Sequence, residues 1–263
     1  MIDKLLTHID AHLEIDADAV RALLVDFIAE ELDRAGYRRA VIGLSGGIDS
    51  AVACFLAAEA LGAENVLAMW LPYRTSDPAN LTDAQAVVDR LGVPFKTVEI
   101  TPLVDPYFAL APDITPRRRG NVMARARMVM GTSNKTEIWV GYGTIHGDMA
   151  CALNPLGDLY KTQVRQLARY LGVPQSIIDK PPSADLWAGQ TDEGELGFAY
   201  ADIDRAQYLL MDAGYTVPKA IASGLPRALV EGVWGMIQAS YFKRTLPPVA
   251  KLPRSHAVDP FDG

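Results

Sequence analysis

The segment Ser45–Ser50, Ser-Gly-Gly-Ile-Asp-Ser, has residue types that suit the binding of phosphate. It follows the apolar run Ala40–Leu44 and leads into the apolar stretch Ala51–Leu61, which predicts a strand, a tight turn and the start of a helix. Such a turn directs backbone N–H groups and the positive end of a helix dipole at one point. Asp49 would repel a phosphate, so we expect it to hold Mg²⁺ beside the phosphate. The alternative is a glycine-rich turn without a ligand, in which Asp49 and the two serines have no role.

Strands and helices alternate around this turn. Residues 39–44, 65–71 and 94–100 are predicted strands, and residues 49–61 and 78–91 are predicted helices. The nearly continuous apolar run over 65–71 is typical of a strand covered on both faces. This alternation predicts an α/β fold, a doubly wound parallel sheet flanked by helices, with ligands at the carboxyl ends of the strands.

The remaining segments complete a predicted single domain over residues 1–263. An amphipathic helix with an Asp cap is expected over 19–35. Further helices are expected over 120–130, 133–141, 158–171, 195–212 and 226–241. Loops are expected over 105–120 and 180–194, and an extended, proline-rich tail over 246–263.

Composition excludes several functional classes. The net charge of −7 disfavours nucleic acid as a partner. The one short basic run, Arg117–Arg119, is either a solvated loop or a contact for an anionic substrate. Cys54 and Cys151 are too few for a disulfide framework and match no zinc spacing. No segment has the length of a membrane span or the pattern of a signal peptide, so we expect a cytoplasmic protein without a membrane partner.

Motifs along the chain keep the order and spacing of a known enzyme family. The loop resembles the S-G-G-x-D-S loop of ATP pyrophosphatases, and the later motifs resemble those of NAD synthetase, which amidates deamido-NAD with ATP and ammonia. These motifs are Asn121-x-x-Ala-Arg125, Gly131-Thr-Ser-Asn-Lys-Thr-Glu137, Gly147-Asp148, Asp158-Leu-Tyr-Lys161-Thr-Gln-Val164, Lys180-Pro-Pro-Ser183, Gln190-Thr-Asp-Glu193 and Phe242-Lys-Arg244. The resemblance covers nearly the whole chain and implies an adenine nucleotide alpha-hydrolase-like fold.

The resemblance also implies roles for individual residues. Residues implied to bind ATP are Gly43, Leu44, Ser45, Gly46, Gly47, Ile48, Asp49, Ser50, Thr132, Lys161 and Ser183. Residues implied to bind deamido-NAD are Arg125, Phe242 and Lys243. Asp49 and Glu137 would hold Mg²⁺, while Asp148, near the ammonia site, and Lys161, on the ATP phosphates, would be catalytic. For Lys161 the alternative is a solvated lysine in the first turn of a helix.

The implied reaction is ATP-dependent amidation through an acyl-adenylate, with release of AMP and pyrophosphate. The implied partners are deamido-NAD, ATP and ammonia, with Mg²⁺ as cofactor, in a homodimer whose interface uses the first predicted helix and the 120–130 helix. Residues 180–195, which combine prolines, a tryptophan and glycines, are expected to close over the intermediate.

Three substitutions and one junction depart from the family pattern. Ile145 stands where a lysine is common, Ala152 where an aspartate is common, and Phe242 where a histidine is common. Met130 leads directly into Gly131, where the resemblance implies further residues that include an apolar strand. We therefore expect either a chain break at Met130–Gly131 or a rebuilt edge of the site.

These departures leave other functions open. The first is another adenylating, amide-forming enzyme of the same fold with a different carboxylate substrate. A tRNA-thiolating relative is disfavoured by the acidic charge and by the lack of paired cysteines. A non-catalytic nucleotide-binding protein is disfavoured by the presence of Asp49, Glu137, Asp148 and Lys161.

Overall fold

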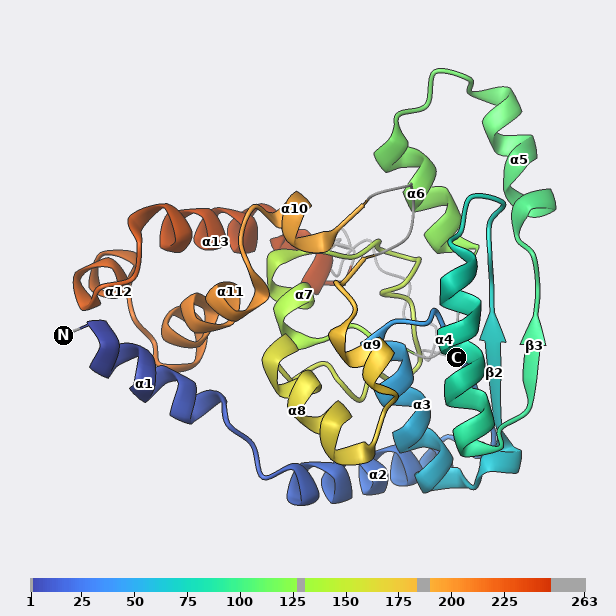
Figure 1. Cartoon of the computed structure of the whole chain (residues 1–263). Coiled ribbons are helices and arrows are strands. Elements are labelled where there is room, and N and C mark those ends of the chain that lie inside the picture. Colours follow the sequence, from blue (N-terminus) through green and yellow to red (C-terminus); the bar gives the residue numbers. More distant parts are fainter. Residues whose placement is uncertain (1, 127–130, 184–189, 247–263) are drawn as a thin grey trace, which may run out of the picture.

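The computed structural model describes residues 2–126, 131–183 and 190–246. In these ranges three parallel strands form one sheet in the order β1 (Ala40–Gly43), β2 (Val66–Trp70) and β3 (Phe95–Thr97) (Figure 1). Ala40 pairs with Val66, and Ala68 pairs with Phe95. The predicted parallel α/β fold with flanking helices is confirmed.

Helices account for most of the remaining described chain. Helices around the sheet are α2 (Ala17–Arg34), α3 (Ile48–Leu61), α4 (Pro78–Leu91), α8 (Lys161–Leu171) and α9 (Gln175–Asp179). Those beyond it are α1 (Ile2–Leu13), α5 (Thr101–Leu110), α6 (Pro116–Arg125), α7 (Lys135–Val140), α10 (Asp192–Leu196), α11 (Tyr200–Gln207), α12 (Val217–Ser223) and α13 (Arg227–Ala239). Three further helical segments are the 3₁₀ helices η1 (Ala63–Asn65) and η3 (Tyr241–Arg244) and the π-helix η2 (Tyr208–Asp212). No helix in these ranges is long and apolar enough to cross a membrane.

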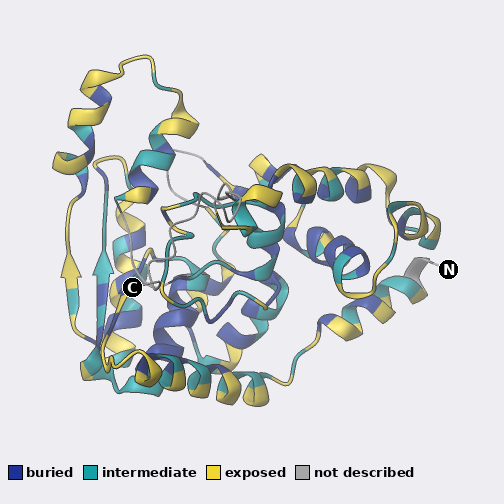
Figure 2. Ribbon diagram, turned by 180° about the vertical axis from the view of Figure 1, so that it is seen from behind, coloured by how far each residue is buried: buried dark blue, intermediate teal, exposed yellow. Residues whose placement is uncertain are grey.

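Helix α3 lies at the centre of the largest hydrophobic core. Its residues from Ser50 to Ala57 are all buried, so it is covered on every side (Figure 2). It packs against α2, α8, β1 and β2. This packing fixes the first turn of α3 at the carboxyl end of β1, where the Ser45–Ser50 loop lies.

A second core joins the helices that follow the sheet. Helices α7, α11 and α13 contact one another, and Tyr200, Ile203 and Val233 are fully buried among them. Helix α8 packs on both groups, through α3 on one side and α7 and α11 on the other. The first residue of α8, Lys161, therefore lies between the two cores.

The predicted loop over 105–120 is wrong, because α5 and α6 occupy most of it. The prolines that suggested a loop lie where helices accept them: Pro116 is in the first turn of α6, which Thr115 caps. Pro106 lies inside α5, which still forms a helix of ten residues. Helix α6 thus begins before the predicted Gly120.

Other expectations need smaller corrections. The first predicted helix is α2, capped by Asp16 as expected, but a separate helix, α1, precedes it. The helix predicted over 195–212 is divided by Gly197 into the end of α10 and α11, which continues into η2. Helices α9 and α12 were not predicted, and β3 is shorter than the predicted strand. The Met130–Gly131 junction, part of the 180–195 segment and nearly all of the 246–263 tail lie outside the described residues.

Candidate active site

One cavity of about 1500 Å³ brings the predicted site residues together. It lies beyond the carboxyl ends of β1 and β2, and the Gly43–Ser50 segment forms part of its wall. The remaining predicted residues on its wall are Arg125, Thr132, Glu137, Asp148, Lys161, Ser183, Phe242 and Lys243. Residues far apart in sequence thus share one site.

The Ser45–Ser50 loop is held in shape by its own hydroxyl groups. The backbone N–H of Ser45 donates to Ser50 Oγ at 3.2 Å, and the backbone N–H of Gly47 donates to Ser45 Oγ at 3.3 Å. Ser50 Oγ donates to the Gly47 carbonyl at 3.0 Å. Gly46 has φ +79°, and a Cβ there would lie 2.5 Å from the carbonyl oxygen of Asn80. The loop therefore requires glycine at this position and presents the first turn of α3 to the cavity.

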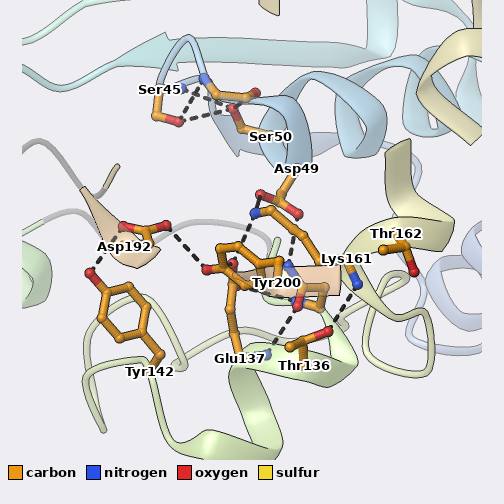
Figure 3. Close-up of polar contacts among 12 residues, drawn as sticks. Ser45, Asp49, Ser50, Thr136, Glu137, Tyr142, Lys161, Thr162, Asp192 and Tyr200 are labelled. Carbon is orange, nitrogen blue, oxygen red and sulfur yellow. Dashed lines mark hydrogen bonds and ion pairs between the residues drawn. The ribbon is translucent and has the colours of Figure 1, made fainter. Parts of the chain in front are cut away.

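Lys161 lies between two carboxylates from different elements (Figure 3). Its Nζ is 2.5 Å from Asp49 Oδ2 in α3 and 3.0 Å from Glu137 Oε1 in α7. The same ammonium lies 4.9 Å from the centroid of the Tyr200 ring in α11. Lys161 is only 1% exposed. The alternative of a solvated lysine is therefore wrong.

A capping box places Glu137 in this site. Asn134 caps α7 by accepting the Glu137 N–H at 3.0 Å, and Glu137 Oε2 accepts the Asn134 N–H at 3.4 Å. The other side-chain group of Asn134, Nδ2, donates to Asp49 Oδ1 at 2.9 Å. Asn134 thus fixes both carboxylates, which sequence reasoning did not predict, although the spacing Asn-x-x-Glu is that of a capping box.

A second network holds the first turn of α8 from behind. The Thr136 hydroxyl donates to Asp204 Oδ1 at 2.6 Å and accepts the backbone N–H of Lys161 at 2.9 Å. Asp204 Oδ2 accepts the backbone N–H of Thr162 at 2.9 Å. Thr136 and Asp204 are fully buried. One carboxylate of α11 therefore ties α7 to the helix end that carries Lys161.

Two tyrosines connect this centre to α10. The Tyr200 hydroxyl lies 3.3 Å from Glu137 Oε1 and donates to Asp192 Oδ2 at 3.2 Å. The Tyr142 hydroxyl lies 3.0 Å from Asp192 Oδ1 and 2.7 Å from Glu195 Oε2. Asp192, Glu195 and Tyr142 also line the cavity. None of these four was predicted as a site residue, although the Gln190–Glu193 motif contains Asp192.

Asp148 lies in a different part of the cavity wall. Its Oδ1 accepts the backbone N–H of Thr144 at 2.9 Å. Lys243 Nζ donates to the carbonyls of Gly141 and Gly143 at 2.7 and 2.6 Å, which fixes it on the same loop. Ile145 and Phe242, two of the departures from the family pattern, line the cavity as well.

Burial and neighbouring charges shift the pKa values of these groups. Burial tends to lower the pKa of Lys161, but Asp49 and Glu137 raise it on balance, so the ammonium stays charged. Burial raises the pKa of Glu137 against the opposing effect of Lys161, and it raises the pKa of Asp192 and Asp148. Because burial disfavours the charged form of these acids, a cation bound beside them would stabilise the carboxylates.

The Asp49 and Glu137 carboxylates fit a magnesium site. They lie on two sides of one ammonium, so they already surround the position of a positive charge. Within the described residues no group of three or more His, Cys, Asp and Glu could hold a metal ion. Mg²⁺ commonly takes one or two protein carboxylates and completes its shell with substrate phosphates and water. The pair therefore suits Mg²⁺ that arrives with a nucleotide.

The parallel sheet, the glycine–serine loop at the start of α3 and the acidic pair beside it are features of a nucleotide-binding α/β enzyme. The model of the NAD synthase family matches residues 20–247. The chain belongs to the NAD synthase family.

Individual relatives agree with this assignment. The NH(3)-dependent NAD(+) synthetase of Trichlorobacter lovleyi is 51% identical over 255 residues, which cover 92% of this chain and 93% of that protein. The structure of the NH3-dependent NAD synthetase of Campylobacter jejuni, in complex with nitrate, is 32% identical with a TM-score of 0.77, and covers 90% of this chain and all of that one. An NMN synthetase from Francisella tularensis is 33% identical with a TM-score of 0.78, and covers 91% of this chain and all of that one.

Proposed function

We propose that the cavity is the active site of an ammonia-dependent NAD synthetase, in which the residues described above bind ATP and activate a carboxylate. The chain is a ligase that forms a C–N bond: it amidates deamido-NAD to NAD and uses ATP as co-substrate. The observation that carries the assignment of residues is the Asp49–Lys161–Glu137 cluster beside the serine loop, in one cavity.

The chemistry explains the need for such a cluster. A carboxylate resists ammonia because oxide is a poor leaving group. A carboxylate oxygen of deamido-NAD attacks the α-phosphorus of ATP, and pyrophosphate leaves. Ammonia then attacks the carbonyl carbon of the acyl-adenylate, and AMP leaves with the former carboxylate oxygen.

The formation of the acyl-adenylate requires residues that bind ATP and stabilise the departing pyrophosphate. The Ser45–Ser50 loop and the first turn of α3 bind the departing pyrophosphate, and Lys161 stabilises its charge. Asp49 and Glu137 would hold Mg²⁺, which supplies further positive charge to the phosphates. Thr132 and Ser183, which also line the cavity, contact ATP.

The remaining assignments concern the acyl-adenylate and its nucleophile. Asp148 lies near the acyl group and positions ammonia, and Arg125, Phe242 and Lys243 bind the dinucleotide. These roles are proposals that rest on the shared cavity and on the family motifs.

Exposed apolar side chains support the proposal of a homodimer. Leu103, Tyr107 and Leu110 are 60%, 64% and 85% exposed in α5, which packs on α6, and Leu23 of α2 is 66% exposed. Helix α2 corresponds to the first element expected at the interface, and α6 covers residues 120–125 of the second. Light scattering on the purified chain tests this, with a monomer as the contradicting result. The use of ATP and of a dinucleotide substrate supports a cytoplasmic location.

A second candidate function is the amidation of the corresponding mononucleotide, which the likeness to the Francisella NMN synthetase favours. This candidate is one form of the alternative given above, an amide-forming enzyme of the same fold with a different carboxylate substrate. ATP–pyrophosphate exchange decides between the candidates when it is measured with deamido-NAD, nicotinate mononucleotide and other carboxylates. Exchange that depends on deamido-NAD and is lost in Asp49→Ala and Glu137→Ala, with unchanged folding, supports the proposal. Exchange with another carboxylate alone, or undiminished exchange in these variants, contradicts it.

A further inference from the structure

Three consecutive arginines at the start of α6 have three different environments. Arg117 and Arg118 are both exposed, but only Arg117 lines the cavity. The Arg119 guanidinium lies 4.5 Å from the centroid of the Phe108 ring in α5. The basic run is therefore part of a helix rather than a solvated loop, and only its first arginine faces the site.

Arg117 belongs to a polar face of α6 that points into the cavity. Arg117, Asn121 and Arg125 all line the cavity, and their spacing of four residues places them on one side of the helix. The Thr144 hydroxyl donates to Asn121 Oδ1 at 3.1 Å, which joins this face to the loop that carries Asp148. The face thus has a defined position relative to the rest of the site.

The positive charge of this face is not balanced by protein carboxylates. In the described part of the chain, Arg117, Arg125 and Lys243 form no ion pair. Arg117 is close enough to Lys243 that its charge, after burial, lowers the pKa of the lysine, and Asp148 only partly opposes this. Like charges that face one cavity favour an anion between them.

The opposite charge gathers elsewhere on the cavity wall. Asp49 and Glu137 contact Lys161, and Asp192 is joined to Glu137 through the Tyr200 hydroxyl. This part of the wall suits a metal ion and the phosphates of ATP. Deamido-NAD carries anionic groups of its own, which must be bound in addition to the phosphates of ATP. Arg117 and Lys243 line the same cavity and carry the positive charge that such a group requires.

We propose that Arg117 is a substrate-binding residue that contacts an anionic group of the deamidated nucleotide, either its pyrophosphate or its nicotinate carboxylate. This inference rests on the proposed function. A charged hydrogen bond of this kind changes affinity by about tenfold or more.

The test is calorimetric titration of deamido-NAD and of NAD, without ATP, into the wild type, Arg117→Gln and the matched control Arg118→Gln. We expect about tenfold weaker binding of deamido-NAD to Arg117→Gln, and unchanged binding to Arg118→Gln. NAD keeps the pyrophosphate but carries a neutral amide. Equal weakening of both ligands therefore identifies the pyrophosphate as the group bound, and weakening of deamido-NAD alone identifies the carboxylate.

Two further measurements separate binding from folding. Removal of a cation that faces Lys243 should leave the melting temperature of Arg117→Gln no lower than that of the wild type, and the KM for ATP should not change. If Arg117→Gln binds deamido-NAD as tightly as the wild type does, this inference alone is contradicted. The same holds if the substitution raises only the KM for ATP. A wild type that fails to bind deamido-NAD contradicts the proposed function and this inference together.

Discussion

Replacement of Lys161 by methionine should have opposite effects on catalysis and on metal binding. Methionine keeps much of the side-chain volume but removes the ammonium that lies 2.5 Å from Asp49 and 3.0 Å from Glu137. These two carboxylates are only 18% and 14% exposed, so they are left close together with little water. Breaking a buried ion pair by removing one partner costs about 3–5 kcal/mol.

The size of this loss can be expressed as a melting temperature. For a domain of this size each kcal/mol corresponds to about 2–4 °C, so Lys161→Met should melt about 6–20 °C lower without metal. Mg²⁺ should raise its melting temperature more than that of the wild type, because in the wild type the ion competes with the ammonium for Asp49 and Glu137. Pyrophosphate exchange should nevertheless be lost, since Lys161 no longer holds the ATP phosphates.

Lys135 offers a matched control. Its Nζ lies 3.0 Å from Asp212 and 3.1 Å from Asp158, but Asp158 is 97% exposed. Lys135→Met should therefore cost only about 0–1 kcal/mol, and its response to Mg²⁺ should match the wild type. The measurement is differential scanning fluorimetry with and without Mg²⁺. A Lys161→Met melting temperature equal to that of the wild type would contradict the buried ion pair. An equal rise in melting temperature with Mg²⁺ in both proteins would contradict the proposed competition.

Three further predictions concern other parts of the site. Gly46→Ala should abolish pyrophosphate exchange and lower the free energy of unfolding by about 1–3 kcal/mol, because φ is +79° and the new Cβ would meet Asn80 at 2.5 Å; wild-type exchange would contradict this. Asp148→Asn should still form the adenylate but transfer it slowly to ammonia, and equal loss of both half-reactions in rapid-quench experiments would refute this role. Burial raises the pKa of Asp204 above 3.8, so its contribution to stability falls as the pH rises above 3.8 through the folded-state pKa. In urea unfolding, the free energy of unfolding of Asp204→Asn should fall less than that of the wild type as the pH rises through this range. An equal dependence of the free energy of unfolding on pH in the two proteins would contradict the assignment.

The sequence predicted those parts of the site that depend on local pattern. The Ser45–Ser50 loop and the start of α3 follow from strand and glycine signals over a few residues, and the helix predicted over 133–141 contains Glu137. Such features need no knowledge of distant contacts.

Features made by distant contacts could not be predicted in this way. Lys161 is buried because Tyr200 of α11 packs against its ammonium and because Asp49 and Glu137 enclose it. No pattern near Lys161 reports these partners. Asp204 is a similar case, since it appears as one of several acidic residues of an amphipathic helix until α7 and α8 are placed beside it.

The most direct test of the central claim follows the carboxylate oxygen. Deamido-NAD labelled with ¹⁸O in its nicotinate carboxylate is incubated with the enzyme, ATP, Mg²⁺ and ammonia, and the products are analysed by mass spectrometry. The proposed acyl-adenylate predicts that each NAD formed is accompanied by AMP that carries a single ¹⁸O atom, and by unlabelled pyrophosphate. Label in pyrophosphate or inorganic phosphate, or AMP without label, would contradict activation of the carboxylate by adenylation.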